Sequence, residues 1–264
     1  MEMKSVENWN EVAADYQRTY NLGLNDYNAE LLDFWQCSGM IFPGCRALDI
    51  GCGVGKYGSY LAALGCDVTL TDISPEMIKL AEKNMEKFAS PWRARVCDFD
   101  TITGKEPEFS GGFDFAISTM SPAIHDVKTV RKMSDLTHGW CFIARFSSWN
   151  QPSRDRLLAK FGIEPKQSGE RFAADCEEMI KIVSGAGYSP QVKYVEYNWC
   201  DIRTIGETAE YMQSRYLKDL DYAVEKDAVI SATEKLCNSD GLFEDSVNTK
   251  VAWIYWNTRE RNEK

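Results

Sequence analysis

The chain has 264 residues, with 40 acidic side chains against 30 lysines and arginines, so its formal net charge is −10. Apolar residues make up 44% of it, which excludes an intrinsically disordered chain. The acidic balance argues against nucleic acid or an anionic membrane as the main partner. We predict no signal peptide and no transmembrane helix. The nine cysteines include no closely spaced pair, so we expect reduced thiols in a cytoplasmic protein without a metal site.

The first two thirds of the chain alternate between strand and helix patterns. Apolar side chains at helical spacing predict helices around Trp9 to Tyr20 and around Leu31 to Trp35. Short apolar runs then predict five strands, at 46–50, 67–71, 93–97, 113–118 and 140–146. Helical patterns separate them, at 57–64, 74–85 and 126–136. Such an order predicts an α/β fold with a parallel sheet covered by helices on both faces.

The last third has a different pattern. We expect a helix over 172–184, a strand over 192–197, a charged helical stretch over 204–236 and a closing strand over 251–256. The charged stretch is too long for a hairpin loop. We therefore interpret the chain as one domain, with an N-terminal helical segment at 1–43, a core at 44–203 and 246–264, and a helical cap inserted at 204–245. The cap is expected to order over the acceptor site when ligands bind.

A glycine-rich turn follows the first predicted strand. Gly51, Gly53 and Gly55 lie at alternate positions, which lets the backbone approach a ligand closely at a helix N-terminus. Asp72 ends the second predicted strand, where a carboxylate can accept hydrogen bonds from both hydroxyls of a ribose. Asp49 stands just before the glycines, where a carboxylate would repel a pyrophosphate. It suits a cationic group instead, such as the ammonium of S-adenosylmethionine.

At these residues the sequence resembles the class I S-adenosylmethionine-dependent methyltransferases, and small-molecule methyltransferases with an N-terminal helical segment in particular. Four motifs carry the resemblance in order: Leu48–Gly55, Leu70–Ser74, Val96–Phe99 and Phe113–Ser118. The resemblance implies a doubly wound, Rossmann-like sheet of seven strands in the order 3-2-1-4-5-7-6, with the last strand antiparallel. Residues 119–124 lack the Asn/Asp-Pro-Pro signature of amino-group methylation on bases, which argues against an enzyme of that type.

The resemblance also implies S-adenosylmethionine as the cofactor and assigns residues to it. The expected cofactor residues are Tyr16, Asp49, Gly51, Gly53, Gly55, Asp72, Ile73, Asp98, Phe99 and Ser118. Within this set, Asp98 is expected at the adenine amine with Phe99 beside it, although a solvated loop acid is the alternative. Tyr16 is expected to close over the cofactor or simply to pack its helix onto the sheet.

Two residues are candidates for the acceptor side of the site. His125 follows the fourth strand, where loops form the active site of an open α/β sheet, and a histidine can move a proton near neutral pH. Arg145 lies inside an apolar strand, so it requires either a structural partner or an anionic group of the acceptor. The expected reaction is methyl transfer to a small anionic or zwitterionic molecule. The alternatives are methylation of a protein or RNA, a non-catalytic S-adenosylmethionine-binding protein, and an NAD(P)-dependent oxidoreductase.

Overall fold

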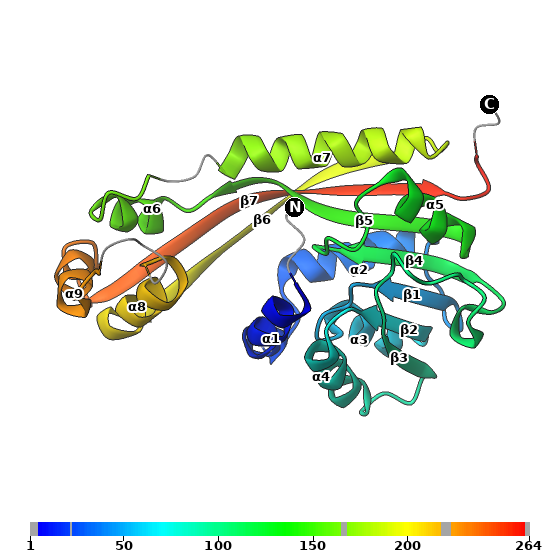
Figure 1. Cartoon of the computed structure of the whole chain (residues 1–264), viewed down its shortest axis with the longest axis horizontal. Helices are drawn as coiled ribbons and strands as arrows, with labels where there is room; N and C mark the ends of the chain where they lie inside the picture. The colour runs from blue at the N-terminus through cyan, green and yellow to red at the C-terminus, as the bar shows by residue number, and fades with distance from the viewer. Residues whose placement is uncertain (1–4, 22, 165–167, 218–222, 262–264) are drawn as a thin grey trace. The chain divides into compact units, whose positions relative to one another are not determined.

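The sheet has the predicted strand order. We describe it from a computed structural model, which covers residues 5–21, 23–164, 168–217 and 223–261. Among these residues, seven strands form one sheet in the order β3-β2-β1-β4-β5-β7-β6 (Figure 1). Their bounds are β1 Arg46–Ile50, β2 Asp67–Asp72, β3 Trp92–Val96, β4 Phe113–Thr119, β5 Thr137–Asn150, β6 Gln191–Thr204 and β7 Leu242–Asn257. The predicted α/β, Rossmann-like fold class is confirmed.

The sheet is mixed. The pairs β1–β2, β1–β4, β2–β3 and β4–β5 are all parallel. By contrast, Thr258 beyond the end of β7 donates its N–H to Gly139 near the start of β5, at 2.9 Å. Farther along β5, Ser147 donates its hydroxyl to the carbonyl of Lys250, which lies earlier in β7, at 3.2 Å. As β5 advances its partner residues in β7 recede, so β7 is antiparallel, as the resemblance implied.

Most of the helices lie close to the predicted positions, and the predicted cap at Ser74 is present, whereas α6 was not predicted. They are α1 Val6–Asn21, α2 Asp26–Cys37, α3 Lys56–Ala63, α4 Pro75–Met85, α5 Val127–Asp135, α6 Pro152–Ala159, α7 Ser168–Gly185, α8 Ile205–Met212 and α9 Lys226–Glu234, with a 3-10 turn η1 at Pro107–Phe109 and a π turn η2 at Gln213–Leu217. The hydroxyl of Ser74 caps α4 by accepting from the N–H of Met77 at 3.1 Å. None of the helices in the described part of the chain combines the length and apolar character of a membrane span.

The chain divides into two compact units. Unit 1 comprises Met1–Arg145, Asp175–Tyr194 and Ala252–Lys264, and unit 2 comprises Phe146–Ala174 and Val195–Val251. Strands β5, β6 and β7 therefore contribute residues to both. Unit 2 includes the whole of the segment 204–245, in which α8 and α9 are the helices. The role of this segment as a cap over an acceptor stays a prediction.

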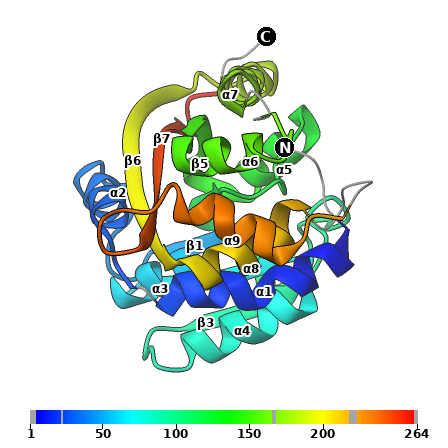
Figure 2. The ribbon, with the colours of Figure 1, turned by 90° about the vertical axis from the view of Figure 1, so that its left-hand side faces the viewer.

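Unit 1 buries both faces of its part of the sheet. On one face the fully buried Trp35 of α2 makes edge contacts with the rings of Phe115 in β4 and Phe142 in β5. On the other face α5 and α7 cover a core cluster that includes Leu48, Ala116, Ile143, Met133 and Val183. Helix α1 lies along α4, where Ala13, Val54 and Met77 form a smaller buried cluster (Figure 2). The described unit therefore has helices on both faces, as expected of a doubly wound sheet.

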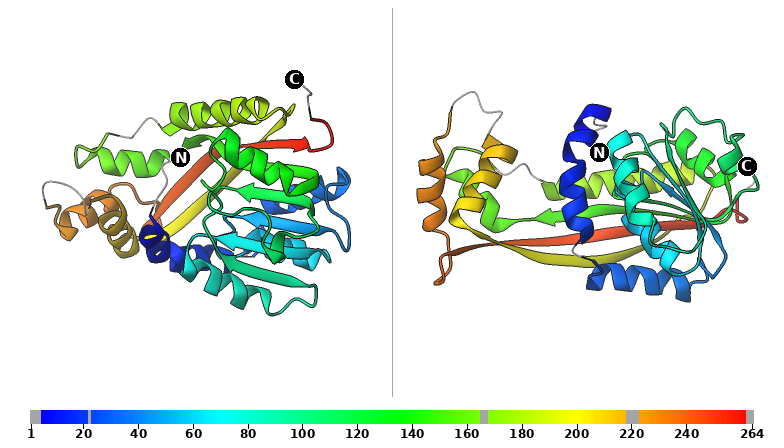
Figure 3. Two further views of the ribbon diagram at one scale, coloured as in Figure 1. Left: turned by 45° about the vertical axis from the view of Figure 1, so that its right-hand side comes forward. Right: turned by 90° about the horizontal axis from the view of Figure 1, so that it is seen from below.

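Unit 2 has a core of its own beneath the paired helices α8 and α9 (Figures 2 and 3). Its buried members are Leu157, Leu158, Ala209, Met212, Leu217, Val229 and Phe243. A polar group is buried among them: Asp245 accepts from Gln151 Nε2 at 2.6 Å and faces Arg203 at 3.5 Å. Burial raises the pKa of Asp245 above its usual value. Half-buried aromatic rings, among them Trp149, Tyr197 and Trp199, contact one another in the same unit.

Candidate cofactor site

Asp72 is held at both of its carboxylate oxygens where β2 ends. Gly53 donates its N–H to Oδ2 and Ser74 donates its N–H to Oδ1, each at 2.9 Å. Burial raises the pKa of Asp72, and these N–H donors oppose that effect. Two backbone bonds fix the carboxylate but leave each oxygen capacity for a further donor. The glycine loop after β1 and the acid after β2 are thus joined in one rigid arrangement.

Asp49 is fully buried in β1, and one of its oxygens has no hydrogen-bond partner. Oδ2 accepts from the N–H of Gly58 at 3.1 Å, whereas Oδ1 has no partner among the residues described. Burial raises the pKa of Asp49 to about 7, opposed by the Gly58 N–H and assisted by the Asp72 charge. An orphaned buried carboxylate oxygen costs free energy unless a donor meets it. A cationic ligand group beside the glycine loop would supply that donor.

Gly51 lies at the place where the loops after β1 and β4 meet. Its φ of +69° lies in the left-handed region that favours glycine. A Cβ added there would stand 1.9 Å from Oγ and 2.8 Å from Cβ of Ser121. Only a residue without a side chain therefore lets the loop after β4 close on the loop after β1. The two loops form the part of the sheet edge at which the resemblance places a cofactor.

The adenine-side residues Asp98 and Phe99 follow β3. Phe99 is buried, and Asp98 Oδ1 accepts from the N–H of Asp100 at 2.9 Å. Lys132 of α5 holds this loop, because its ammonium donates to the carbonyls of Phe99 and Asp100, both at 2.8 Å. Sequence reasoning missed Lys132, since a lysine on a helix usually indicates only a solvated face. Its role is defined by a contact between segments more than thirty residues apart.

Ser118 lies near the end of β4, and His125 lies in the loop that follows it. Ser118 is fully buried at the end of β4, and its hydroxyl oxygen has no partner among the described residues. His125 Nε2 lies 3.5 Å from Asp100 Oδ2, and its buried Nδ1 has no hydrogen-bond partner in the described part of the chain. Asp100, which follows the third motif, thus lies beside the histidine. Proton transfer by His125 stays a prediction.

Arg145 of β5 binds backbone carbonyls of the loop after β4. It is buried at the end of the unit 1 part of β5. Its guanidinium donates to the carbonyl of Ser121 and, at 2.6 Å, to the carbonyl of Ile124. Burial lowers the pKa of Arg145 to about 10, so the side chain stays charged at neutral pH. Contact with an anionic acceptor remains a prediction.

Tyr16 and Ile73 lie at the periphery of the candidate cofactor site. Tyr16 is 46% exposed on α1, and its ring meets that of Trp9 edge to face at 6.3 Å. Ile73 is half-buried between Asp72 and the start of α4. Helix α1 is fixed near this point, because the hydroxyl of Ser74 donates to Asn10 Oδ1 at 2.6 Å. Closure of Tyr16 over a cofactor stays a prediction.

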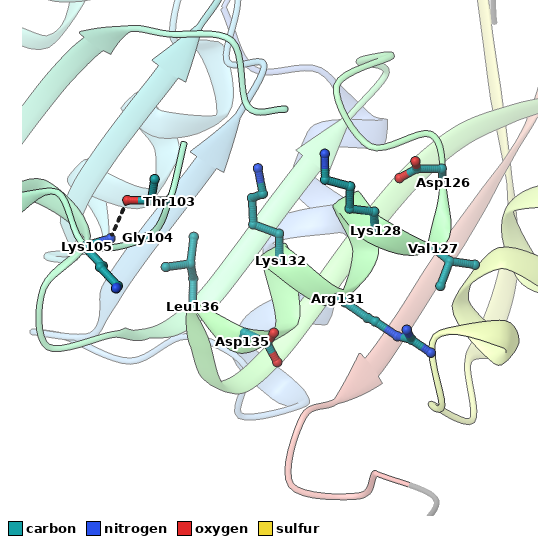
Figure 4. A pocket seen from close by; sticks show the side chains of 10 residues that line it. All are labelled: Thr103, Gly104, Lys105, Asp126, Val127, Lys128, Arg131, Lys132, Asp135 and Leu136. Atoms are coloured by element: carbon teal, nitrogen blue, oxygen red, sulfur yellow. Dashed lines mark hydrogen bonds between the residues drawn. The ribbon is translucent and has the colours of Figure 1, made fainter. Parts of the chain in front are cut away.

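A surface hollow of about 840 Å³ lies between α5 and the loop before η1 (Figure 4). Its lining residues are Thr103, Gly104, Lys105, Asp126, Val127, Lys128, Arg131, Lys132, Asp135 and Leu136. No predicted cofactor residue lines this hollow. Figure 4 shows Lys132 and Lys128 directed alike and Arg131 directed away from them. Lys132 is the residue that relates the hollow to the site, through its bonds to the Phe99–Asp100 loop.

The chain matches known methyltransferases over this part of the fold. Residues 47–138 match the family described as "Methyltransferase domain". A ubiquinone biosynthesis O-methyltransferase of Xanthomonas campestris pv. campestris (strain B100) is 34% identical over 83 residues, which are 31% of this chain and 33% of the relative. The corresponding enzyme of Chromobacterium violaceum is 27% identical over 198 residues, 66% of this chain and 82% of the relative. The first of these alignments thus spans about a third of the relative's length.

Solved structures give weaker likenesses. A geranyl diphosphate methyltransferase in complex with GPP and sinefungin is 16% identical, with a TM-score of 0.49, covering 88% of this chain and 77% of that one. Magnesium protoporphyrin IX methyltransferase from Synechocystis PCC 6803 with bound SAH is 20% identical, with a TM-score of 0.44, covering 74% and 82%. Scores this low carry no functional weight.

Residues 47–138 match the methyltransferase domain family. The strand order and the glycine loop joined to Asp72 resemble those of the class I S-adenosylmethionine-dependent methyltransferases. The cofactor of this class, S-adenosylmethionine, fits the residues present. Asp49 Oδ1 and Ser118 Oγ are buried polar atoms without a partner among the described residues, and they lie in the motifs expected at the cofactor.

Proposed function

We propose that this protein transfers the methyl group of S-adenosylmethionine to an oxygen atom of a small molecule. The observation that carries the proposal is the doubly held carboxylate of Asp72 beside the glycine loop and the orphaned oxygen of Asp49. The oxygen acceptor is supported by the relatives named ubiquinone biosynthesis O-methyltransferase. The free cysteines of the chain support a reducing compartment, the cytosol.

The residues of the chain would bind and orient the cofactor. Asp72 would accept from the ribose hydroxyls, Asp49 would face the ammonium, and Asp98 with Phe99 would contain the adenine. When bound, S-adenosylmethionine supplies an electrophilic methyl group on a sulfonium, so little covalent chemistry is left to the protein. The protein aligns donor and acceptor and excludes water. A hydroxyl acceptor must lose a proton, and His125, which lies beside Asp100, is the candidate base in the loop after β4.

The proposed function does not specify the charge of the acceptor. An anionic or zwitterionic acceptor was expected from Arg145, but that guanidinium donates to loop carbonyls instead. We therefore place no anion contact in the proposed function. Methylation of RNA is disfavoured by the net charge of −10, because phosphate contacts require clustered lysine and arginine.

Binding of the cofactor product, S-adenosylhomocysteine, should depend on pH through Asp49. The folded pKa of Asp49 is about 7, above its ordinary value of 3.8. Protonated Asp49 therefore stabilises the folded state of the ligand-free protein. This contribution is fully present below pH 3.8 and is lost as the pH rises through 7. A bound ligand with a cationic group favours the ionised form of Asp49 instead of the protonated form. We expect affinity to rise about tenfold between roughly pH 6 and pH 8.

Calorimetry across this range, on the wild-type protein and on Asp49→Asn, measures the effect. The asparagine keeps the size of the side chain but cannot ionise, so most of the rise should disappear. An equally steep rise in the variant would assign the titration to another group and remove the ammonium from Asp49.

The oxygen-methylation proposal is tested by a transfer assay. The purified full chain is incubated with methyl-labelled S-adenosylmethionine and a panel of small hydroxyl acceptors, chiefly catechols and hydroxybenzoates. Matched amines and thiols, a protein mixture and an RNA mixture form the comparison arms. Label recovered as a methyl ether is the expected result. Label recovered only on amines, protein or RNA would contradict the proposal and name the alternative.

A further inference from the structure

A buried arginine ties the loop after β4 to the strand beside it. Arg145 sits in β5 and donates to the carbonyls of Ser121 and Ile124, two residues that bracket the tight turn after β4. A guanidinium has several donors in a fixed plane, so it can hold two carbonyls at a defined separation. Burial of a charge is costly, and Arg145 is buried here among backbone acceptors, with the charge of Asp175 acting on it as well.

The turn that Arg145 holds contains a residue with an unfavourable backbone conformation. Met120 has a φ of +52°, in the left-handed region where a residue with a side chain is disfavoured. Its N–H is fixed to the carbonyl of Ala144, next to Arg145, at 3.0 Å. A strained conformation persists only where the surroundings over-determine it. The bonds of Arg145 to Ser121 and Ile124, together with the bond from Met120 to Ala144, tie this turn to β5.

The far side of the same turn meets the glycine loop. Ser121, whose carbonyl accepts from Arg145, lies so close to Gly51 that no Cβ fits between them. Its hydroxyl accepts from the N–H of Ala123 at 3.2 Å, which keeps the side chain turned within the loop. A continuous path of contacts thus runs from Arg145 through Ser121 to the glycine loop that the class uses for its cofactor.

We infer that Arg145 is a positioning residue, which holds the 120–124 turn against Gly51 and thereby sets the shape of the cofactor site. The inference rests on the proposed function only in taking the glycine loop as the cofactor site. It differs from an anion contact in a measurable way. An anion contact affects the acceptor alone, whereas a residue that positions the turn affects S-adenosylhomocysteine binding with no acceptor present.

Two substitutions separate these roles. Arg145→Met removes every hydrogen-bond donor of the side chain and keeps nearly the same side-chain length. Arg145→Lys keeps the charge but can bind fewer of the loop carbonyls. Arg93→Met is the control, because Arg93 pairs with Asp67 at the opposite end of β2, at 2.9 Å. We expect S-adenosylhomocysteine to bind about tenfold more weakly to Arg145→Met, with partial recovery in Arg145→Lys and no change in the control.

Hydrogen exchange of the ligand-free proteins is the second readout. Amides at 119–126 should exchange faster in both Arg145 variants, while β1 and β2 keep their protection. Affinity within about twofold of wild type in Arg145→Met, with unchanged exchange, would overturn the inference. If Arg145→Met does not fold, Arg145→Lys decides by the same two measurements. A wild-type protein that fails to bind S-adenosylhomocysteine would refute the proposed function, and exchange at 119–126 would still test the role of Arg145.

Discussion

Replacing Asp72 with alanine should weaken S-adenosylhomocysteine binding by about 2–4 kcal/mol, roughly 30- to 1000-fold. The carboxylate is already fixed by the N–H groups of Gly53 and Ser74, so a ligand need not spend binding energy on orienting it. The substitution removes charge-assisted acceptors for two hydroxyls and releases the two backbone donors. Calorimetry at neutral pH measures the change.

Asp67 provides the matched control, because it begins the strand that Asp72 ends. Asp67 pairs with Arg93 at 2.9 Å and with Arg46 at 3.9 Å, at the opposite edge of the sheet. Asp67→Ala should leave binding unchanged, because these half-buried ion pairs near the surface contribute about 1 kcal/mol to folding and lie away from the ligand. Equal effects of the two substitutions would show that general loosening of β2, rather than a ribose contact, explains the loss.

Gly51→Ala should be the most damaging single-methyl addition to the cofactor site. An alanine at φ +69° costs about 1 kcal/mol in backbone conformation alone. The collision with Ser121 adds about 1–3 kcal/mol, because the neighbouring turn is itself held by Arg145. Urea denaturation should therefore show a loss of about 2–4 kcal/mol, and S-adenosylhomocysteine binding should fall with it.

The matched control is Gly39→Ala. Gly39 has a φ of +66°, but no atom lies within 4 Å of an added Cβ. This substitution carries the conformational cost without the collision, so it should lose only about 1 kcal/mol and keep its ligand affinity. Equal losses for the two glycines would mean that the loop after β4 moves aside freely, against the close approach described for Gly51 and Ser121.

The first half of the fold was predictable because its signals are local. The run Arg46–Ile50 is β1 without adjustment, and Ser74 with Pro75 marks the start of α4 as predicted. Asp72 could be found because it ends a short apolar strand at a set distance from the glycines. Each of these features depends on residues near one another in the chain, so a single sequence contains the necessary information.

The long strands were predicted too short. β7 runs over Leu242–Asn257, whereas only 251–256 was expected. Its first half alternates buried residues such as Phe243, Val247 and Thr249 with more exposed ones, although two acids and a lysine also lie in it. Asp245 is fully buried in that half, which polarity alone argues against. Its partner Gln151 lies 94 residues away, so only tertiary structure explains the burial.

The supporting residues of the site escaped prediction for the same reason. Lys132 holds the Phe99–Asp100 loop, Asp100 faces His125, and Ser121 meets Gly51. None of them belongs to a motif, because each acts on a segment distant in sequence. Arg145 was noticed as a charge in an apolar strand, and that observation was sound. Its acceptors are backbone carbonyls, however, which a sequence does not display.

Calorimetric titration of the full chain with S-adenosylmethionine and, separately, with NAD⁺ tests the central claim most directly. The two ligands share a ribose for Asp72, but only the first has an ammonium group for Asp49 and lacks a pyrophosphate. The expected result is saturable one-site binding of S-adenosylmethionine in about the micromolar range, weakened by roughly 30- to 1000-fold in Asp72→Ala, and no heat from NAD⁺. Binding of NAD⁺ with no response to S-adenosylmethionine would contradict the assignment of this site.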